Sequence, residues 1–208
     1  MNPRSSVPQT DALTKLGHVP PNSSTPTRVA HPAPAASTPG RAKVAGMAKT
    51  PELGAPAPDF TLDGVQVTAG EAVRAQYSLF ARQPAGPLVL AFYPGDGTPM
   101  CTRQLCSYTS GFESFEGLGA AVWGISPQDV GSHDRFARKH NLKMPLLADT
   151  GLAVSRLYGI TLGGAGLRRS VFVLDSAGIL RWKHVSLVGL TFPGTKTIAS
   201  QLAALAAA

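Results

Sequence analysis

An apolar segment that runs directly into a helix start constrains the fold of this chain more than any other feature. Residues 87–93 read Pro-Leu-Val-Leu-Ala-Phe-Tyr and contain no charge. A short run that is apolar on both faces is typical of a strand buried within an α/β sheet. Thr98 and Pro99 follow, and these residue types are favoured at the N-cap and the first position of a helix. The pattern predicts a buried strand that passes into a helix beginning at Pro99.

The rest of the domain continues this alternation of strands and helices, which predicts an α/β fold with a central mixed sheet flanked by helices. We expect a hairpin over residues 60–67 that turns at Asp63-Gly64, a helix over 99–115, a strand over 120–125, a helix over 132–140 with Ser132 as N-cap, a strand over 145–148, a helical turn ending near Tyr158, paired strands over 170–174 and 179–185, and a helix over 195–207. We interpret residues 162–166 as a flexible connector, because their glycines lack the spacing of a phosphate-binding loop.

The first 50 residues differ in composition from the remainder. They contain eight prolines, six Lys or Arg and one acidic residue. A segment of this kind buries too little apolar surface to offset its ordering entropy. We therefore divide the chain into a disordered basic tail, residues 1–50, and a domain, residues 51–208. Two alternatives for the tail are a transit peptide and a translation start at Met47.

Charge and cysteine content exclude several classes of protein. The formal net charge is +7, but the tail contributes +5 of it, so the domain gives no case for nucleic-acid binding. No apolar run has the length of a membrane-spanning helix. Two cysteines are too few for a disulfide-rich secreted scaffold. We expect a soluble cytoplasmic protein without a membrane partner.

Cys101 is the candidate reactive group. With Thr98 as N-cap, Cys101 lies in the first helical turn, where unpaired backbone N–H groups and the helix dipole favour an anion. The anion here is a thiolate, which is the reactive form of cysteine. Alternatively, Cys101 is a small buried hydrophobic residue. A zinc site is disfavoured, because C-x4-C is not a usual ligand pair and no other Cys/His pair completes it.

The segment around Cys101 resembles the peroxiredoxin family. Pro94, Thr98 and Cys101 match its motif P-x-x-x-T-x-x-C, and Cys106 lies five residues after Cys101, as in the bacterioferritin-comigratory or Q-type branch. Residues 169–175 resemble the family's R-x-x-F-x-x-D strand, which begins here at Arg169. The likeness extends from about residue 54 to the C-terminal helix. Gly95, Gly97 and Met100 depart from the usual residues of the branch, but none of these changes removes a catalytic group.

This resemblance implies a thioredoxin-like fold and a thiol-dependent peroxidase that reduces hydrogen peroxide and organic hydroperoxides. Cys101 would be the peroxidatic cysteine and Cys106 the resolving cysteine, with Thr98, Pro94 and Arg169 completing the catalytic set. Thioredoxin or a similar dithiol would recycle the enzyme. No metal, haem, flavin or nicotinamide cofactor is implied, and we expect a monomer or a non-covalent dimer.

Two other functions stay open at this stage. A general disulfide oxidoreductase would use the same chemistry, but such proteins typically carry C-x-x-C. A peroxide sensor or redox relay would use the same cysteine pair and pass its oxidation to a partner without high turnover.

The spacing of Cys101 and Cys106 also predicts a conformational change. On one regular helix their Cα atoms are about 8.7 Å apart. A disulfide needs less than about 7 Å. Oxidation to the disulfide must therefore unwind part of this helix.

Overall fold

The structure is a computed structural model that describes residues 49–81, 86–163, 166–187 and 191–207. The expected tail, residues 1–50, lies almost entirely outside these ranges, so its predicted disorder and the boundary at residue 51 remain predictions.

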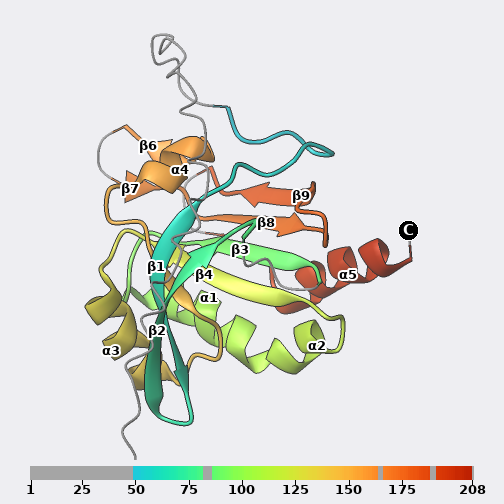
Figure 1. Ribbon diagram of the computed structural model, residues 1–208. Coiled ribbons are helices and arrows are strands. Elements are labelled where there is room, and N and C mark those ends of the chain that lie inside the picture. Colours follow the sequence, from blue (N-terminus) through green and yellow to red (C-terminus); the bar gives the residue numbers. More distant parts are fainter. Residues whose placement is uncertain (1–48, 82–85, 164–165, 188–190, 208) are drawn as a thin grey trace, which may run out of the picture. The chain divides into compact units, whose positions relative to one another are not determined.

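A mixed sheet organises the described part of the chain (Figure 1). Its strands are β1 (Thr61–Thr68), β2 (Glu71–Ser78), β3 (Leu88–Phe92), β4 (Ala121–Ser126), β5 (Leu146–Ala148), β8 (Ser170–Leu174) and β9 (Leu180–Val185), in the order β2-β1-β5-β4-β3-β8-β9. The neighbours β3, β4 and β5 are parallel, whereas β8 runs antiparallel to β3 and to β9. A separate short pair is formed by β6 (Thr161–Leu162) and β7 (Gly166–Leu167). The predicted α/β fold with a mixed sheet is confirmed.

Helices pack on both faces of this sheet. They are α1 (Pro99–Ser110), α2 (Phe112–Glu116), α3 (Val130–His140), α4 (Ala153–Leu157) and α5 (Thr195–Ala206). One core cluster joins β3, β4 and β8 to side chains of α1, α2, α3 and α5. A second cluster, on the opposite face, joins the same strands to α4 and to the segment before β1.

Strand β3 lies near the centre of the sheet, and all five of its residues are buried. Val89 and Ala91 contribute to the first cluster, while Leu88, Leu90 and Phe92 contribute to the second. This alternation is the side-chain period of a strand, here with both faces covered. The segment after β3 therefore begins at a fully buried strand and leads to the start of α1.

The predicted hairpin at Asp63-Gly64 is wrong. These two residues lie inside β1, and the chain turns instead at Ala69 and Gly70, which both have positive φ. A Cβ atom on Gly64 would lie 2.8 Å from the Leu146 carbonyl oxygen of β5. Glycine is thus required at this position for close packing of strands rather than for a turn.

Two helix boundaries also differ from the prediction. The helix expected over 99–115 ends at Ser110, and α2 begins after Gly111. A Cβ atom at Gly111 would collide with the Thr195 side chain of α5, so the break gives α5 room to pack. The N-cap of α3 is Asp129 rather than Ser132, because the Asp129 carboxylate accepts the Ser132 backbone N–H at 2.8 Å.

The remaining expected elements are present with small shifts in their bounds. The connector expected at residues 162–166 joins β6 to β7, and residues 164–165 lie outside the described ranges. Within those ranges no helix has the length and apolar character needed to cross a membrane.

Candidate active site

Cys101 lies in the first turn of α1, as the sequence predicts. Thr98 is the N-cap, and its hydroxyl oxygen accepts the Cys101 backbone N–H at 3.3 Å. Pro99 occupies the first helical position. The Cys101 side chain is completely buried in the first core cluster. A thiolate here would face the positive end of the helix dipole.

Arg169 supplies a fixed positive charge to this cysteine. Its Nη2 donates to Cys101 Sγ at 3.3 Å, although the two residues are 68 positions apart in the chain. The antiparallel pairing of β3 and β8 sets Phe92 opposite Ser170, which brings the residue before β8 to the end of β3 where α1 begins. Arg169 is only 2% exposed, so solvent screens this charge little.

The Arg169 guanidinium is itself held by a chain of buried groups. Its Nη1 donates to Gln104 Oε1, and Gln104 Nε2 donates to the Tyr108 hydroxyl at 3.3 Å. Tyr108 donates in turn to the Pro193 carbonyl oxygen at 2.9 Å. Burial raises the pKa of Tyr108, so the group stays a neutral donor. Gln104 and Tyr108 therefore orient the cation that faces Cys101.

Cys106 is partly buried and packs against the same core cluster. Both cysteines are free thiols, and both lie within the continuous helix α1. The helical geometry behind the predicted conformational change is thus present. In this state the two residues cannot bond to each other.

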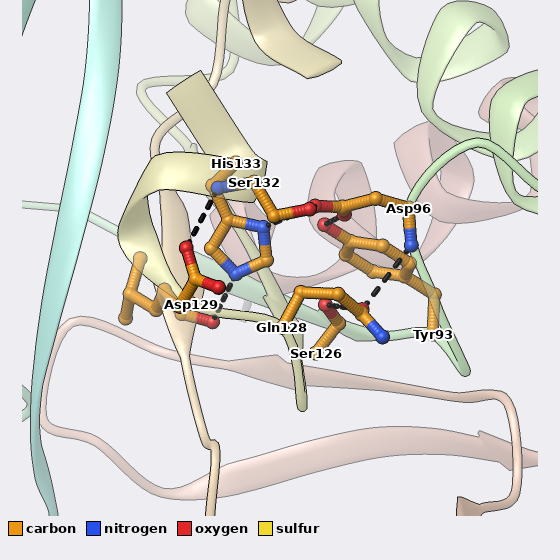
Figure 2. A network of polar contacts seen from close by, with 8 residues as sticks. Tyr93, Asp96, Ser126, Gln128, Asp129, Ser132 and His133 are labelled. Carbon is orange, nitrogen blue, oxygen red and sulfur yellow. Dashed lines mark hydrogen bonds and ion pairs between the residues drawn. The ribbon is translucent and has the colours of Figure 1, made fainter. Parts of the chain in front are cut away.

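Pro94 follows β3 and is partly buried at the beginning of the segment that leads to Thr98. Asp96, in the middle of this segment, belongs to a buried polar network that Figure 2 shows. Its carboxylate accepts hydrogen bonds from Tyr93 and Ser132, each at 2.8 Å, and faces His133 Nδ1 at 2.9 Å. The network ties the segment before Cys101 to helix α3.

The structure brings Thr98, Cys101 and Arg169 together, with Cys106 on the same helix and Pro94 at the entrance to the segment. Sequence reasoning missed Gln104, Tyr108, Asp96 and His133. Gln104 could have been found from its spacing, because it lies three residues after Cys101 and so shares a helix face with it. The contact between Asp96 and His133 joins residues 37 positions apart and leaves no local signal.

Comparison with known proteins agrees with this geometry. The AhpC/TSA family matches residues 53–183, a range that includes every predicted site residue. Chloroplastic peroxiredoxin Q of Triticum aestivum is 41% identical over 98 residues, which cover 46% of this chain and 45% of that protein. The bacterioferritin comigratory protein of Xanthomonas campestris, described in a study of its alkyl peroxide reduction activity, is 27% identical with a TM-score of 0.55, over 69% of this chain and 91% of that chain.

The fold has a further match in the reduced 2-Cys peroxiredoxin of Plasmodium vivax. It superimposes with a TM-score of 0.67 at 20% identity, over 74% of this chain and 96% of that chain. The thioredoxin-like fold implied by the resemblance is confirmed. The chain spans about half the length of the curated relatives it matches. The match over residues 53–183 and the predicted Q-type resemblance agree, and the chain belongs to the AhpC/TSA family.

Proposed function

We propose that this protein is a thiol-dependent peroxidase that reduces hydrogen peroxide and organic hydroperoxides in antioxidant defence. One observation carries the proposal: the buried Cys101 Sγ lies 3.3 Å from Arg169 Nη2 at the N-terminus of α1. This arrangement stabilises a thiolate through a fixed cation and a helix dipole. The family membership and the similarity to peroxiredoxin Q support the same chemistry.

In the first step the Cys101 thiolate attacks the terminal peroxide oxygen. The O–O bond breaks, an S–O bond forms, and the departing alkoxide or hydroxide takes a proton to leave as alcohol or water. Cys101 becomes a sulfenic acid. Arg169 lies where it can stabilise both the thiolate and the negative charge that develops on the peroxide oxygens. The Thr98 hydroxyl accepts the Cys101 N–H and still has its own proton to donate to the peroxide.

In the second step the Cys106 thiolate attacks the Cys101 sulfenic sulfur. The S–O bond breaks, water leaves with a proton, and a Cys101–Cys106 disulfide forms. An external dithiol, thioredoxin or a similar protein, then reduces the disulfide by two successive exchanges and is itself oxidised. Cys101 and Cys106 lie five residues apart on the intact helix α1, too far apart to form a disulfide, so this step requires α1 to unwind.

A coupled assay with thioredoxin, its reductase and NADPH tests the proposal. The full chain should consume many equivalents of peroxide, whereas a sensor or relay stops after about one. Cys101→Ser should lose turnover while its circular dichroism spectrum stays unchanged. Cys106→Ser should still react once with peroxide and then stop. Near-normal turnover in Cys101→Ser would disprove the assignment.

The chemistry needs a compartment that holds a dithiol reductant, and the sequence favours the cytoplasm. The wheat relative is chloroplastic, which favours a plastid if the chain comes from a plastid-bearing cell. Imaging a fluorescent protein fused to the C-terminus of the full chain separates these locations. We also propose that the protein acts as a monomer or a non-covalent dimer, which sedimentation of the reduced chain tests.

A further inference from the structure

The segment between β3 and α1 is fastened at Asp96. One carboxylate oxygen accepts the Tyr93 hydroxyl, and the other accepts the Ser132 hydroxyl and faces His133 Nδ1 (Figure 2). The Asp96 backbone N–H donates to Gln128 Oε1 at 3.1 Å. Asp96 is thus joined to Tyr93, which directly follows β3, to α3 and to the loop between β4 and α3.

Asp96 and His133 form a buried pair. The His133 side chain is fully buried, and the Asp96 side chain is 7% exposed. Burial raises the Asp96 pKa, but hydrogen bonds from His133, Ser132 and Tyr93 outweigh it, so the pKa is lowered overall and the carboxylate is ionised. His133 Nε2 faces the Leu147 carbonyl oxygen of β5 at 3.1 Å. Both ring nitrogens of His133 therefore face oxygen atoms that can only accept hydrogen bonds. An imidazolium, which has an N–H on each ring nitrogen, can donate to both.

The restraint ends abruptly after Asp96. Gly97 is exposed and has a φ of +72°. Among the described residues other than its two chain neighbours, no atom lies within 4 Å of the position that a Cβ would take. Thr98 and Pro99 are also exposed. Asp96 is held by several hydrogen bonds, whereas the glycine that follows it can adopt many backbone conformations. The chain after Asp96 can therefore move while Asp96 stays fixed. If α1 unwinds, Gly97 has the conformational freedom to let the chain change direction before the helix while Asp96 stays in place.

We propose that Asp96 and His133 are positioning residues for Cys101. They hold the fixed end of the segment that leads into α1, so that Cys101 occupies its buried position beside Arg169 in the reduced state and returns to it after each cycle. The cycle itself belongs to the proposed peroxidase function, on which this inference rests. The positioning of Cys101 can be measured without it.

Alkylation of Cys101 measures its positioning directly. In a Cys106→Ser background Cys101 is the only thiol, and it is fully buried. Adding Asp96→Ala should raise the rate of iodoacetamide alkylation about tenfold or more, because loss of the Asp96 hydrogen bonds opens the site locally. The measurement is made near pH 9, where exposed thiols are largely ionised, so that access rather than ionisation sets the rate.

Two further variants separate positioning from general destabilisation. Asp96→Asn keeps the shape of the side chain and can donate to a neutral His133, so it should restore most of the protection. Asp134→Asn removes a carboxylate of the exposed Asp134–Arg138 pair on the same helix and should behave like the parent. If Asp96→Ala does not fold, Ser132→Ala, which removes one hydrogen bond to Asp96, must still be alkylated faster than the parent.

Peroxide gives the second readout. In the same background, single-turnover oxidation of Cys101 should be at least about tenfold slower in Asp96→Ala, because a displacement of a reacting group by about 1 Å can cost about 100-fold in rate. Parental alkylation and oxidation rates in a folded Asp96→Ala protein overturn the inference. If the parent itself reacts with peroxide no faster than a free thiol, the proposed function fails, while the alkylation result still decides the role of Asp96.

Discussion

The two adjacent arginines before β8 have separate roles. Arg169 is buried and contacts Cys101 and Gln104, whereas Arg168 turns away and donates to the Gly159 carbonyl oxygen at 2.7 Å. Neighbouring side chains of an extended segment point to opposite faces, which explains how one arginine reaches the cysteine and the other does not. A pair of identical residues thus provides a matched control within the chain.

Replacing each arginine in turn should separate their effects. Arg169→Ala should slow peroxide attack by Cys101 about 100-fold, because a preorganised charged donor is lost. Arg168→Ala should change this rate little. Stopped-flow oxidation in a Cys106→Ser background measures both rates. Equal effects in the two variants would reject Arg169 as the partner of Cys101.

Asp96 makes the free energy of unfolding depend on pH. Its pKa is lowered from the ordinary value of 3.8 in the folded state, so the stabilisation is complete above that value and is lost as the pH falls through the folded value. Asp96→Asn should therefore reduce the free energy of unfolding at pH 7 by roughly 2 kcal/mol. The difference from the parent should shrink below pH 3.8. Urea unfolding at several pH values checks this, and a constant difference would contradict it.

Helix α1 combines two requirements that oppose each other. It must be formed for Cys101 to lie at a helix N-terminus beside Arg169, and in the proposed cycle it must open for Cys106 to reach the sulfenic acid. Ser107 and Thr109 within it have only modest helix propensity, which makes opening less costly than in a helix rich in Ala and Leu. The α1–α2 break at Gly111 limits the length that must unwind.

Hydrogen exchange should detect this opening. Amides of residues 101–110 should be protected in the reduced protein and lose protection after one equivalent of peroxide, because the disulfide cannot form on an intact helix. Cys106→Ser should keep its protection after the same treatment. A disulfide that forms while these amides stay protected would require another resolving route.

The same helix illustrates what the sequence could and could not predict. Thr98, Pro99 and Cys101 were placed correctly because capping depends on a few consecutive residues. The end of the helix was misplaced because Gly111 is fixed by Thr195, which is distant in sequence. The predicted turn at Asp63-Gly64 was wrong for the same reason, because Gly64 allows close packing against strand β5 rather than a turn. Local signals were predictable, whereas contacts between distant elements, such as Asp96 with His133, were not.

At the scale of the whole molecule, the composition of residues 1–50 predicts a disordered tail that adds little to a packed core. A chain beginning at Met47 should therefore match the full chain in peroxide turnover and in melting temperature. Parallel assays and thermal unfolding of the two proteins test this. A large loss of activity, or a clear drop in melting temperature, would show that residues 1–46 contribute to the working structure.

The pairing of β3 with β8 has a consequence for how the protein is made. During translation Cys101 is added 68 residues before Arg169, so the nascent thiol has no cation beside it. Its partner arrives only when β8 has been synthesised and docked against β3. The unfinished polypeptide therefore emerges from the ribosome with an ordinary thiol, and the proposed reactivity toward peroxide begins when the sheet closes.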